Sequence, residues 1–222
     1  MTGRERLLSD LADWISSRMV PQRPTLVAID GVDAAGKSSF SNLLAPMLGR
    51  AGVAIVQVSV DGFHNPAAVR HSRATVEPAL SYYEDSFDYE AFRAHVLNPI
   101  HRSGTTVISP RVFDHESDSP DIADPVVVSD NTIVLVDGVF LGRPELAESW
   151  DHWVYLHSDR NAARARGVER DMRLFGDNTL DRYLSRYEPG QALYLAAVDP
   201  ISNADIVIDN TDPEAPEFFR FS

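Results

Sequence analysis

The sequence predicts an α/β fold with three layers, in which helices cover both faces of a doubly wound, mainly parallel sheet. Short apolar runs rich in Val and Ile carry this prediction, because they are continuous rather than alternating, as in strands that are covered on both faces. Helical patterns alternate with these runs along the chain. The runs expected to form strands are 25–30, 53–60, 105–109, 132–138, 153–158 and 205–209.

Apolar residues that recur at three- and four-residue steps mark the expected helices. These segments are 7–19, 38–48, 89–101, 143–150, 161–175 and 180–187. Pro21 and Pro24 stop the first of them, so residues 1–24 are expected to form an N-terminal helix and a linker. Because no change of composition divides the chain, we expect a single domain over residues 1–222.

Two stretches, 64–88 and 109–125, break the alternation of strands and helices, and the second is rich in Pro and Asp. Loops of this length inside a compact domain usually bind a substrate or close over it. We therefore expect both to lie on the substrate side of the fold, with residues 161–188 forming a helical lid.

The composition excludes several classes of function. The chain has a formal net charge of −13 with its acidic residues spread throughout, whereas nucleic-acid binding needs a basic face. It has no cysteine, which excludes disulfides, thiolate metal sites and cysteine nucleophiles. No apolar run approaches the roughly 20 residues of a membrane-spanning helix. We expect a cytoplasmic protein that binds neither nucleic acid nor membrane. The sequence does not decide between a monomer and a homo-oligomer.

The segment from Gly31 to Ser38 matches the pattern G-x-x-x-x-G-K-[ST], with a predicted strand before it and a predicted helix after it. Such a loop turns backbone N–H groups inward at a helix start and holds the phosphates of a nucleotide. Lys37 is expected to reach the β- and γ-phosphates, and Ser38 to bind Mg²⁺. This is the loop of the P-loop nucleoside triphosphatases, so the expected cofactors are ATP and Mg²⁺. The residues expected to bind them are Gly31, Asp33, Ala34, Ala35, Gly36, Lys37, Ser38 and Ser39.

Two carboxylates follow predicted strands whose carboxyl ends would lie at the same sheet edge as this loop. Asp61 comes directly after the run 53–60, where it can accept the proton of an attacking hydroxyl or help to hold the metal. An Asp at such a place can also merely cap a turn. Asp137 ends the apolar part of the run 132–138, which is the setting of a Walker B carboxylate that binds Mg²⁺.

Further motifs follow the phosphate loop in a defined order. They are a strand ending in D-G-F-H at 61–64, "SFDYEAF" at 86–92, "VLVDGVFL" at 134–141, "RGVERDM" at 166–172 and "SNADIVIDN" at 202–210. In this order they resemble the motifs of the uridine kinase and phosphoribulokinase superfamily, which includes the type I pantothenate kinases. The resemblance extends over about residues 25–210.

The resemblance implies roles for particular residues. Asp61 would be the general base. From its place beside Asp61 in the sequence, His64 is expected to orient Asp61 or to contact the acceptor of the phosphoryl group. Asp88 would bind acceptor hydroxyls, although an Asp before a helical run is equally typical of an N-cap. Asp137 would bind Mg²⁺, directly or through water, at a position where the family usually has Glu.

Arginines gather on the expected helix 161–175, at near-helical spacing. They are Arg164, Arg166, Arg170 and Arg173. Such a cluster can close over the phosphates and stabilise the charge of the transition state, or it can form a solvated helix face. We expect Arg166 and Arg170 to be catalytic, since Arg170 and Asp171 match the family's R-D pair best. The Gly-Arg pair that follows it in uridine kinases is absent here.

One segment departs from the family. Uridine kinases read the base with Y-D-F-x-x-H-x-R, but here Phe113 stands where the Tyr would fall and Asp118 where the His would fall. A pocket without those groups loses strong discrimination for uracil. We expect Arg111, Phe113 and His115 to line an acceptor pocket of different chemistry, unless this segment is a plain surface loop.

The expected function is an enzyme, an ATP-dependent kinase that phosphorylates a hydroxyl of a small molecule, with a nucleoside or a related sugar-like compound favoured. A pantothenate kinase or another small-metabolite kinase of the same superfamily is an alternative. A thymidylate-kinase-like enzyme is another, because "IDGVDAAGKSS" also resembles the loop of that family. The alternative from a different class is a nucleotide-dependent switch that responds to a macromolecule.

Overall fold

The computed structural model describes residues 2–50, 52–102 and 104–221. Its centre is a six-stranded sheet in the order β10-β9-β8-β1-β7-β2, parallel except for the edge strand β10. The strands are β1 (Thr25–Gly31), β2 (Ala54–Ser59), β7 (Thr132–Gly138), β8 (His152–His157), β9 (Ile206–Asp209) and β10 (Glu217–Phe221). All residues of β1 and β7 are buried, as their continuous apolar runs predict.

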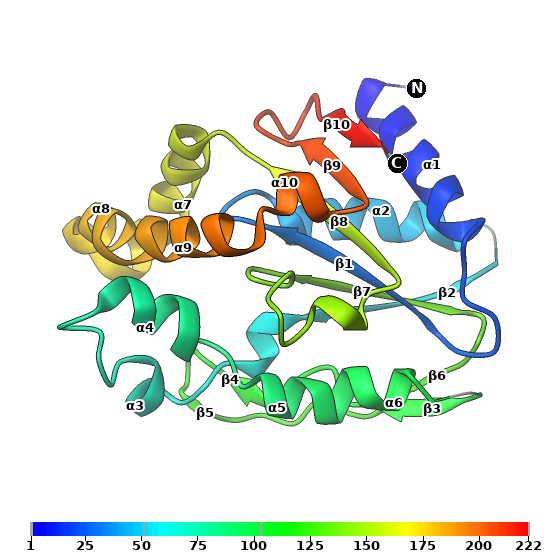
Figure 1. The fold of residues 1–222 in the computed structure, drawn as a ribbon, viewed down its shortest axis with the longest axis horizontal. Helices are drawn as coiled ribbons and strands as arrows, with labels where there is room; N and C mark the ends of the chain where they lie inside the picture. Colours follow the sequence, from blue (N-terminus) through cyan, green and yellow to red (C-terminus); the bar gives the residue numbers. More distant parts are fainter. Residues whose placement is uncertain (1, 51, 103, 222) are drawn as a thin grey trace.

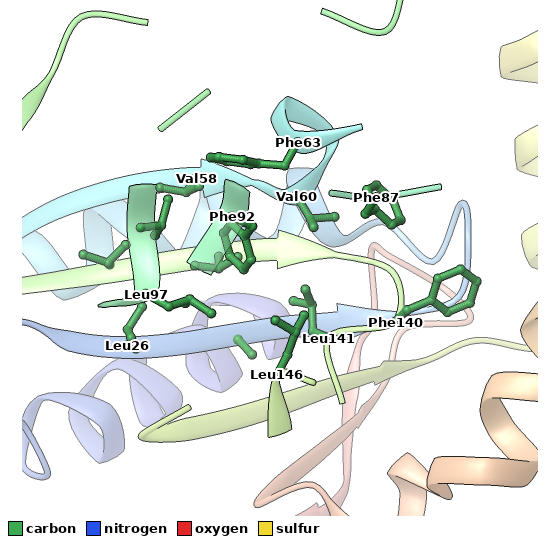
Figure 2. Packing of buried hydrophobic residues seen from close by; sticks show 14 of the residues in the cluster. Leu26, Val58, Val60, Phe63, Phe87, Phe92, Leu97, Phe140, Leu141 and Leu146 are labelled. Carbon is green, nitrogen blue, oxygen red and sulfur yellow. The ribbon is translucent and has the colours of Figure 1, made fainter. Parts of the chain in front are cut away.

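Helices cover both faces of this sheet, which confirms the predicted three-layer fold (Figure 1). On one face, Val27 and Ile29 of β1 pack against helices α1 (Gly3–Ser16) and α2 (Lys37–Gly49). On the other, Leu26 and Ala28 belong to the cluster that contains Phe92. That face is covered by α5 (Tyr89–Phe92), a π-helical turn (Arg93–Leu97) and α6 (Asn98–Ile100). Figure 2 shows Phe92 and Leu97 between Val58, at the top of the view, and Leu26 below them.

Most of the remaining helices gather beyond one end of the sheet, on the left of Figure 1. They are α3 (Ala67–Arg70), α4 (Pro78–Asp85), α7 (Arg160–Phe175), α8 (Thr179–Arg182) and α9 (Glu188–Val198), whereas α10 (Pro200–Asn203) lies beside β8. A π-helical turn, Tyr183–Tyr187, joins α8 to α9, so that residues 179–198 form one helical segment. This segment packs against α4, where a Cβ atom on Gly190 would lie 2.7 Å from the ring of Tyr82.

The predicted strand 105–109 is real, but it does not belong to the central sheet. β3 (Thr106–Ile108) pairs antiparallel with β6 (Val126–Val128) in a separate two-stranded sheet. The side chains alternate there, since Ile108 and Val128 are buried while Val107 and Val127 are half or more exposed. A short apolar run can therefore belong to the central parallel sheet or to a small antiparallel sheet, and its length does not distinguish the two.

The predicted helix 143–150 is wrong. The structure has turns here and a single 3-10 turn, Ala147–Ser149. Pro144 disfavours a helical conformation of the residue before it, and Arg143 is buried and donates hydrogen bonds to Glu145 and to the carbonyl oxygen of Tyr83. The bond to Tyr83 joins this segment to α4, while the bonds to Glu145 are local.

The two irregular stretches contain more structure than the sequence indicates. Residues 64–88 include α3 and α4, and residues 109–125 include a hairpin of β4 (Phe113–Asp114) and β5 (Ser119–Pro120). In the part of the chain that the structure describes, none of the helices has the length and apolar character that crossing a membrane requires.

Candidate active site

The loop after β1 has the backbone conformation of a phosphate cradle. Ala34 and Gly36 have positive φ angles of 56° and 91°, and α2 begins directly after Gly36. A Cβ atom on Gly36 would lie 2.8 Å from Nδ2 of Asn210, closer than real Cβ atoms come. Glycine is therefore required at this position by both its backbone angle and its neighbour.

Three adjacent strands bring the predicted carboxylates to this loop. In the register of the sheet, Asp137 of β7 lies between Ile29 of β1 and Ser59 of β2, and Asp61 follows two residues after Ser59. The hydroxyl of Ser38 donates to Oδ2 of Asp137 at 2.7 Å. Carboxyl ends of parallel strands thus meet here as the sequence predicts.

Asp137 and Ser38 offer the hard oxygen ligands that Mg²⁺ prefers, and Mg²⁺ commonly takes only one or two carboxylates beside water and phosphate oxygens. Burial raises the pKa of Asp137; the Ser38 hydrogen bond and the charge of Lys37 oppose this, and the charge of Asp61 adds to it. Among the described residues there is no cluster of three His, Cys, Asp or Glu side chains that would form an all-protein metal cage. The pair therefore fits a metal ion that arrives with a nucleotide.

A cavity of about 430 Å³ opens above the loop and contains most of the predicted nucleotide-binding residues. The predicted nucleotide-binding, metal-binding and catalytic residues that line this cavity are Asp33, Ala34, Gly36, Lys37, Ser38, Ser39, Asp61, Asp137, Arg166 and Arg170. Gly31 and Ala35 belong to the loop but do not line the cavity, and Ala35 is fully buried. The ammonium group of Lys37 donates to the carbonyl oxygen of Val32 at 2.8 Å, within the loop itself.

The two predicted catalytic arginines of α7 have different partners. Arg166 donates to the carbonyl oxygens of Ala34 and Thr211, at 3.0 and 2.8 Å, and to the hydroxyl of Ser158 at 2.7 Å. These bonds use Nε and both terminal nitrogens of its guanidinium group, so Arg166 ties α7 to the phosphate loop.

Arg170 is more exposed and lies at the border of the site. Its guanidinium group pairs with Asp171 at 2.6 Å and with Asp33 of the phosphate loop at 3.2 Å, and these partners raise its pKa. The hydroxyl of Tyr183 donates to the same Asp33 at 2.6 Å. Arg170 thereby links the loop to the predicted lid.

A second cavity, of about 760 Å³, shares Asp33, Asp61, Tyr82 and Arg170 with the first. Both irregular stretches and the predicted lid form its walls. The stretch 64–88 supplies Ala67, Arg70, His71, Tyr82 and Ser86, the stretch 109–125 supplies His115, Glu116 and Asp118, and the lid supplies Arg170, Asp171, Leu174, Arg182, Arg186 and Tyr187. We call this the acceptor cavity.

His64 lies beside Asp61, as predicted. Its Nδ1 is 2.9 Å from the carbonyl oxygen of Asp61, and its ring stacks on His115 at a centroid distance of 4.7 Å and contacts Phe87. Burial lowers the pKa of His64. The ring therefore fixes the backbone that carries Asp61.

Three other predicted acceptor residues lie outside both cavities. Asp88 caps α5, because its Oδ1 accepts a hydrogen bond of 2.8 Å from the N–H of Ala91. Phe113 is buried, and Arg111 pairs with Asp121 at 2.9 Å. Of the residues predicted in the segment 109–125, His115 is the one that lines the acceptor cavity.

Sequence reasoning missed residues that brace the site from afar. Nδ2 of Asn210, after β9, donates to the carbonyl oxygen of Ala35 at 2.7 Å. The carboxylate of Asp30, fully buried at the end of β1, accepts hydrogen bonds from the N–H of Gly31, from Trp153 Nε1 and from the hydroxyl of Tyr194. Burial raises the pKa of Asp30, and the hydrogen bonds from Tyr194 and Gly31 oppose the rise. The only sequence signal for either residue is a polar side chain at a strand end.

Known structures share this fold. A possible uridine kinase from Bacillus stearothermophilus is 23% identical, with a TM-score of 0.69 over 90% of this chain and 98% of that one. D-glycerate 3-kinase from Cryptococcus neoformans is 12% identical, with a TM-score of 0.67 over 96% and 99% of the two chains. Phosphoribulokinase from Rhodobacter spheroides is 14% identical, with a TM-score of 0.57 over 87% and 74%. No curated protein sequence matches.

The model of the phosphoribulokinase and uridine kinase family matches residues 26–215, which include the phosphate loop, Asp61, Asp137 and the arginines of α7. This range agrees with the order of motifs along the chain. The chain therefore belongs to the phosphoribulokinase / uridine kinase family and is a kinase.

Proposed function

We propose that the protein transfers the γ-phosphoryl group of Mg²⁺-ATP to a hydroxyl group of a small molecule, a nucleoside or another sugar-like compound. The position of Asp61 carries this proposal, since its side chain lines both the cavity above the phosphate loop and the acceptor cavity. A carboxylate at the junction of two binding cavities is placed to act on the group that passes between them.

The chemistry follows from this placement. The acceptor hydroxyl oxygen forms a bond to the γ-phosphorus atom while the bond from that atom to the bridging oxygen breaks and ADP leaves. Asp61 accepts the hydroxyl proton. Lys37 and Arg170 stabilise the negative charge on the transferred group, and Ser38 and Asp137 would hold Mg²⁺, which neutralises the phosphate oxygens when bound.

Arg166 has a different part in this proposal. Its guanidinium group already binds the loop through Ala34 and the segment after β9 through Thr211. It is a positioning residue, which keeps α7 and the phosphate loop at a fixed separation.

The family leaves the acceptor open. The similar structures include a possible uridine kinase and a D-glycerate 3-kinase, whose acceptors differ in size and charge. A pantothenate kinase is a further possibility within the superfamily. The match over residues 26–215 favours all of these over a thymidylate-kinase-like enzyme or a switch.

The test is a screen for ADP release from Mg²⁺-ATP with nucleosides, pantothenate, pentoses, sugar phosphates and glycerate. We expect at least one acceptor to accelerate ADP release by the wild type. Asp61→Asn should lose nearly all of this acceleration, whereas Asp130→Asn, an exposed carboxylate before β7, should keep it. Equal turnover in wild type and Asp61→Asn would remove Asp61 as the base.

A further inference from the structure

One wall of the acceptor cavity gathers arginines. Arg70, Arg182 and Arg186 all line this cavity together with Asp61. Arg70 ends α3, and the other two lie on the helical segment 179–198. Both elements pack against α4, which holds them in one wall.

Arg186 is a buried cation. Its side chain is only 8% exposed, and its guanidinium group donates to two neutral oxygens, the carbonyl of Arg70 at 3.1 Å and the hydroxyl of Ser81 at 3.4 Å. No carboxylate of the described residues forms an ion pair with it within 4.0 Å. A buried charge without an opposite charge is costly, because desolvation is not offset by attraction.

The carboxylates of the same wall have other partners. Asp33 and Asp171 both pair with Arg170. Asp118 pairs with Arg70 at 3.1 Å. Of the other two carboxylates that line the cavity, Glu116 is exposed and Asp61 faces the nucleotide cavity as well.

The electrostatics agree with an excess of positive charge. Burial and the charges of Arg182 and Arg70 lower the pKa of Arg186, and burial and the same three arginines lower the pKa of His71. The chain as a whole carries a net charge of −13. Because the chain has more acidic than basic residues, the absence of a carboxylate beside Arg186 is not explained by a shortage of acidic residues.

We propose that the acceptor carries an anionic group, a phosphate monoester or a carboxylate, which binds to Arg186 with Arg70 and Arg182 while its hydroxyl lies at Asp61. This inference rests on the proposed kinase function and narrows its substrate class. A guanidinium group binds phosphate and carboxylate oxygens with charge-assisted hydrogen bonds. A neutral nucleoside would leave Arg186 uncompensated, so a phosphorylated sugar or a hydroxy acid fits this wall better.

The test compares pairs of acceptors of which only one member carries an anionic group, ribose with ribose phosphate and glycerol with glycerate, by ADP release from Mg²⁺-ATP. We expect only the anionic member of a pair to accelerate release. The pair that responds distinguishes a phosphate from a carboxylate. Arg186→Gln should raise the KM for that acceptor about 10- to 100-fold with a smaller change in kcat. Arg186→Lys should recover part of the affinity, and Arg93→Gln, an exposed arginine outside the cavity, should behave like the wild type.

Calorimetric binding of ribose phosphate and glycerate, without nucleotide, tests the anion site apart from catalysis, and thermal melting confirms that each variant is folded. Tighter binding to the wild type than to Arg186→Gln supports the anion site even if no acceptor is phosphorylated, in which case only the kinase proposal fails. Phosphorylation of a neutral acceptor with an unchanged KM in Arg186→Gln overturns the anion site while the kinase proposal stands. Equal binding to wild type and Arg186→Gln, or binding to neither, also overturns it.

Discussion

The two cavities of this kinase present positive groups on different parts of the chain. Above the phosphate loop, they include Lys37, at the start of α2, and Arg166 of α7. The loop itself follows β1, whose residues are all buried. In the acceptor cavity, they are the side chains of Arg70, Arg182 and Arg186, which lie on short helical elements beyond the sheet. Asp61 and Arg170 line both cavities.

This difference separates two properties of the enzyme. The sheet fixes the groups that hold the nucleotide, since strand ends in register leave them little freedom. Side chains on loops and short helices set the acceptor cavity, and such segments accept substitution without disturbing the sheet. Phosphoryl transfer and acceptor choice should therefore respond to different substitutions.

The largest effect is expected for Lys37→Met. Loss of the charge that meets the transferred group should lower kcat by about 10²- to 10³-fold. Calorimetric affinity for the acceptor should stay the same, because Lys37 does not line the acceptor cavity. A fall in acceptor affinity that matched the fall in kcat would break the distinction between the cavities.

Lys37 also offers a readout that needs no turnover, because it is the only lysine in the chain. Mg²⁺-ATP should protect its side chain from an amine-modifying reagent, as followed by mass spectrometry. Modification at the same rate with and without Mg²⁺-ATP would place the nucleotide elsewhere.

The two arginines of α7 should differ. Arg170→Gln should lower kcat by roughly 10- to 100-fold, since Arg170 faces both cavities. Arg166→Gln should chiefly lower the melting temperature, because it breaks three hydrogen bonds that join α7 to the phosphate loop and to the segments after β8 and β9. Comparing kcat and melting temperature for the two variants checks these roles, and a reversed pattern would exchange them.

The requirement for Mg²⁺ should depend on pH through Asp137. Metal binding needs the carboxylate, and the pKa of Asp137 is raised. As the pH falls through this raised pKa, the Mg²⁺ concentration for half-maximal activity should therefore rise, at a higher pH than for an ordinary Asp. Asp137→Asn should raise that concentration by about tenfold or more at every pH and flatten its pH dependence. Activity titrations with Mg²⁺ at several pH values measure both effects.

The smallest effect is expected for Asn210→Ala. It leaves the buried carbonyl of Ala35 without its partner, which should lower the free energy of unfolding by about 1–3 kcal/mol. Asn98→Ala, at an exposed position at the start of α6, is the matched control and should change it by less than about 0.5 kcal/mol. Urea denaturation measures both values, and equal losses would remove the bracing role of Asn210.

The parts of the site that the sequence predicts are those that local patterns encode. Gly36, Lys37, Asp61 and Asp137 follow apolar runs, and parallel strands bring such positions to one edge. The pattern at 143–150 misleads because it carries no sign that the buried Arg143 binds the carbonyl oxygen of Tyr83, which is distant in sequence.

The rest of the site depends on contacts between segments that are distant in sequence. Asn210 bonds Ala35 across 175 residues, and Arg186 meets Ser81 across 105. Within the segment 109–125, the hairpin decides that Phe113 is buried while His115 reaches the cavity. A single sequence carries no periodic signal for these pairings.

The most direct test of the central claim follows the phosphoryl group itself. Wild type and Asp61→Asn are incubated with Mg²⁺-ATP labelled in its γ-phosphate and the acceptor that best accelerates ADP release. The proposed function predicts that the wild type places the label on the acceptor and that Asp61→Asn transfers almost none. Label found only in inorganic phosphate, at a rate that no acceptor changes, would contradict it.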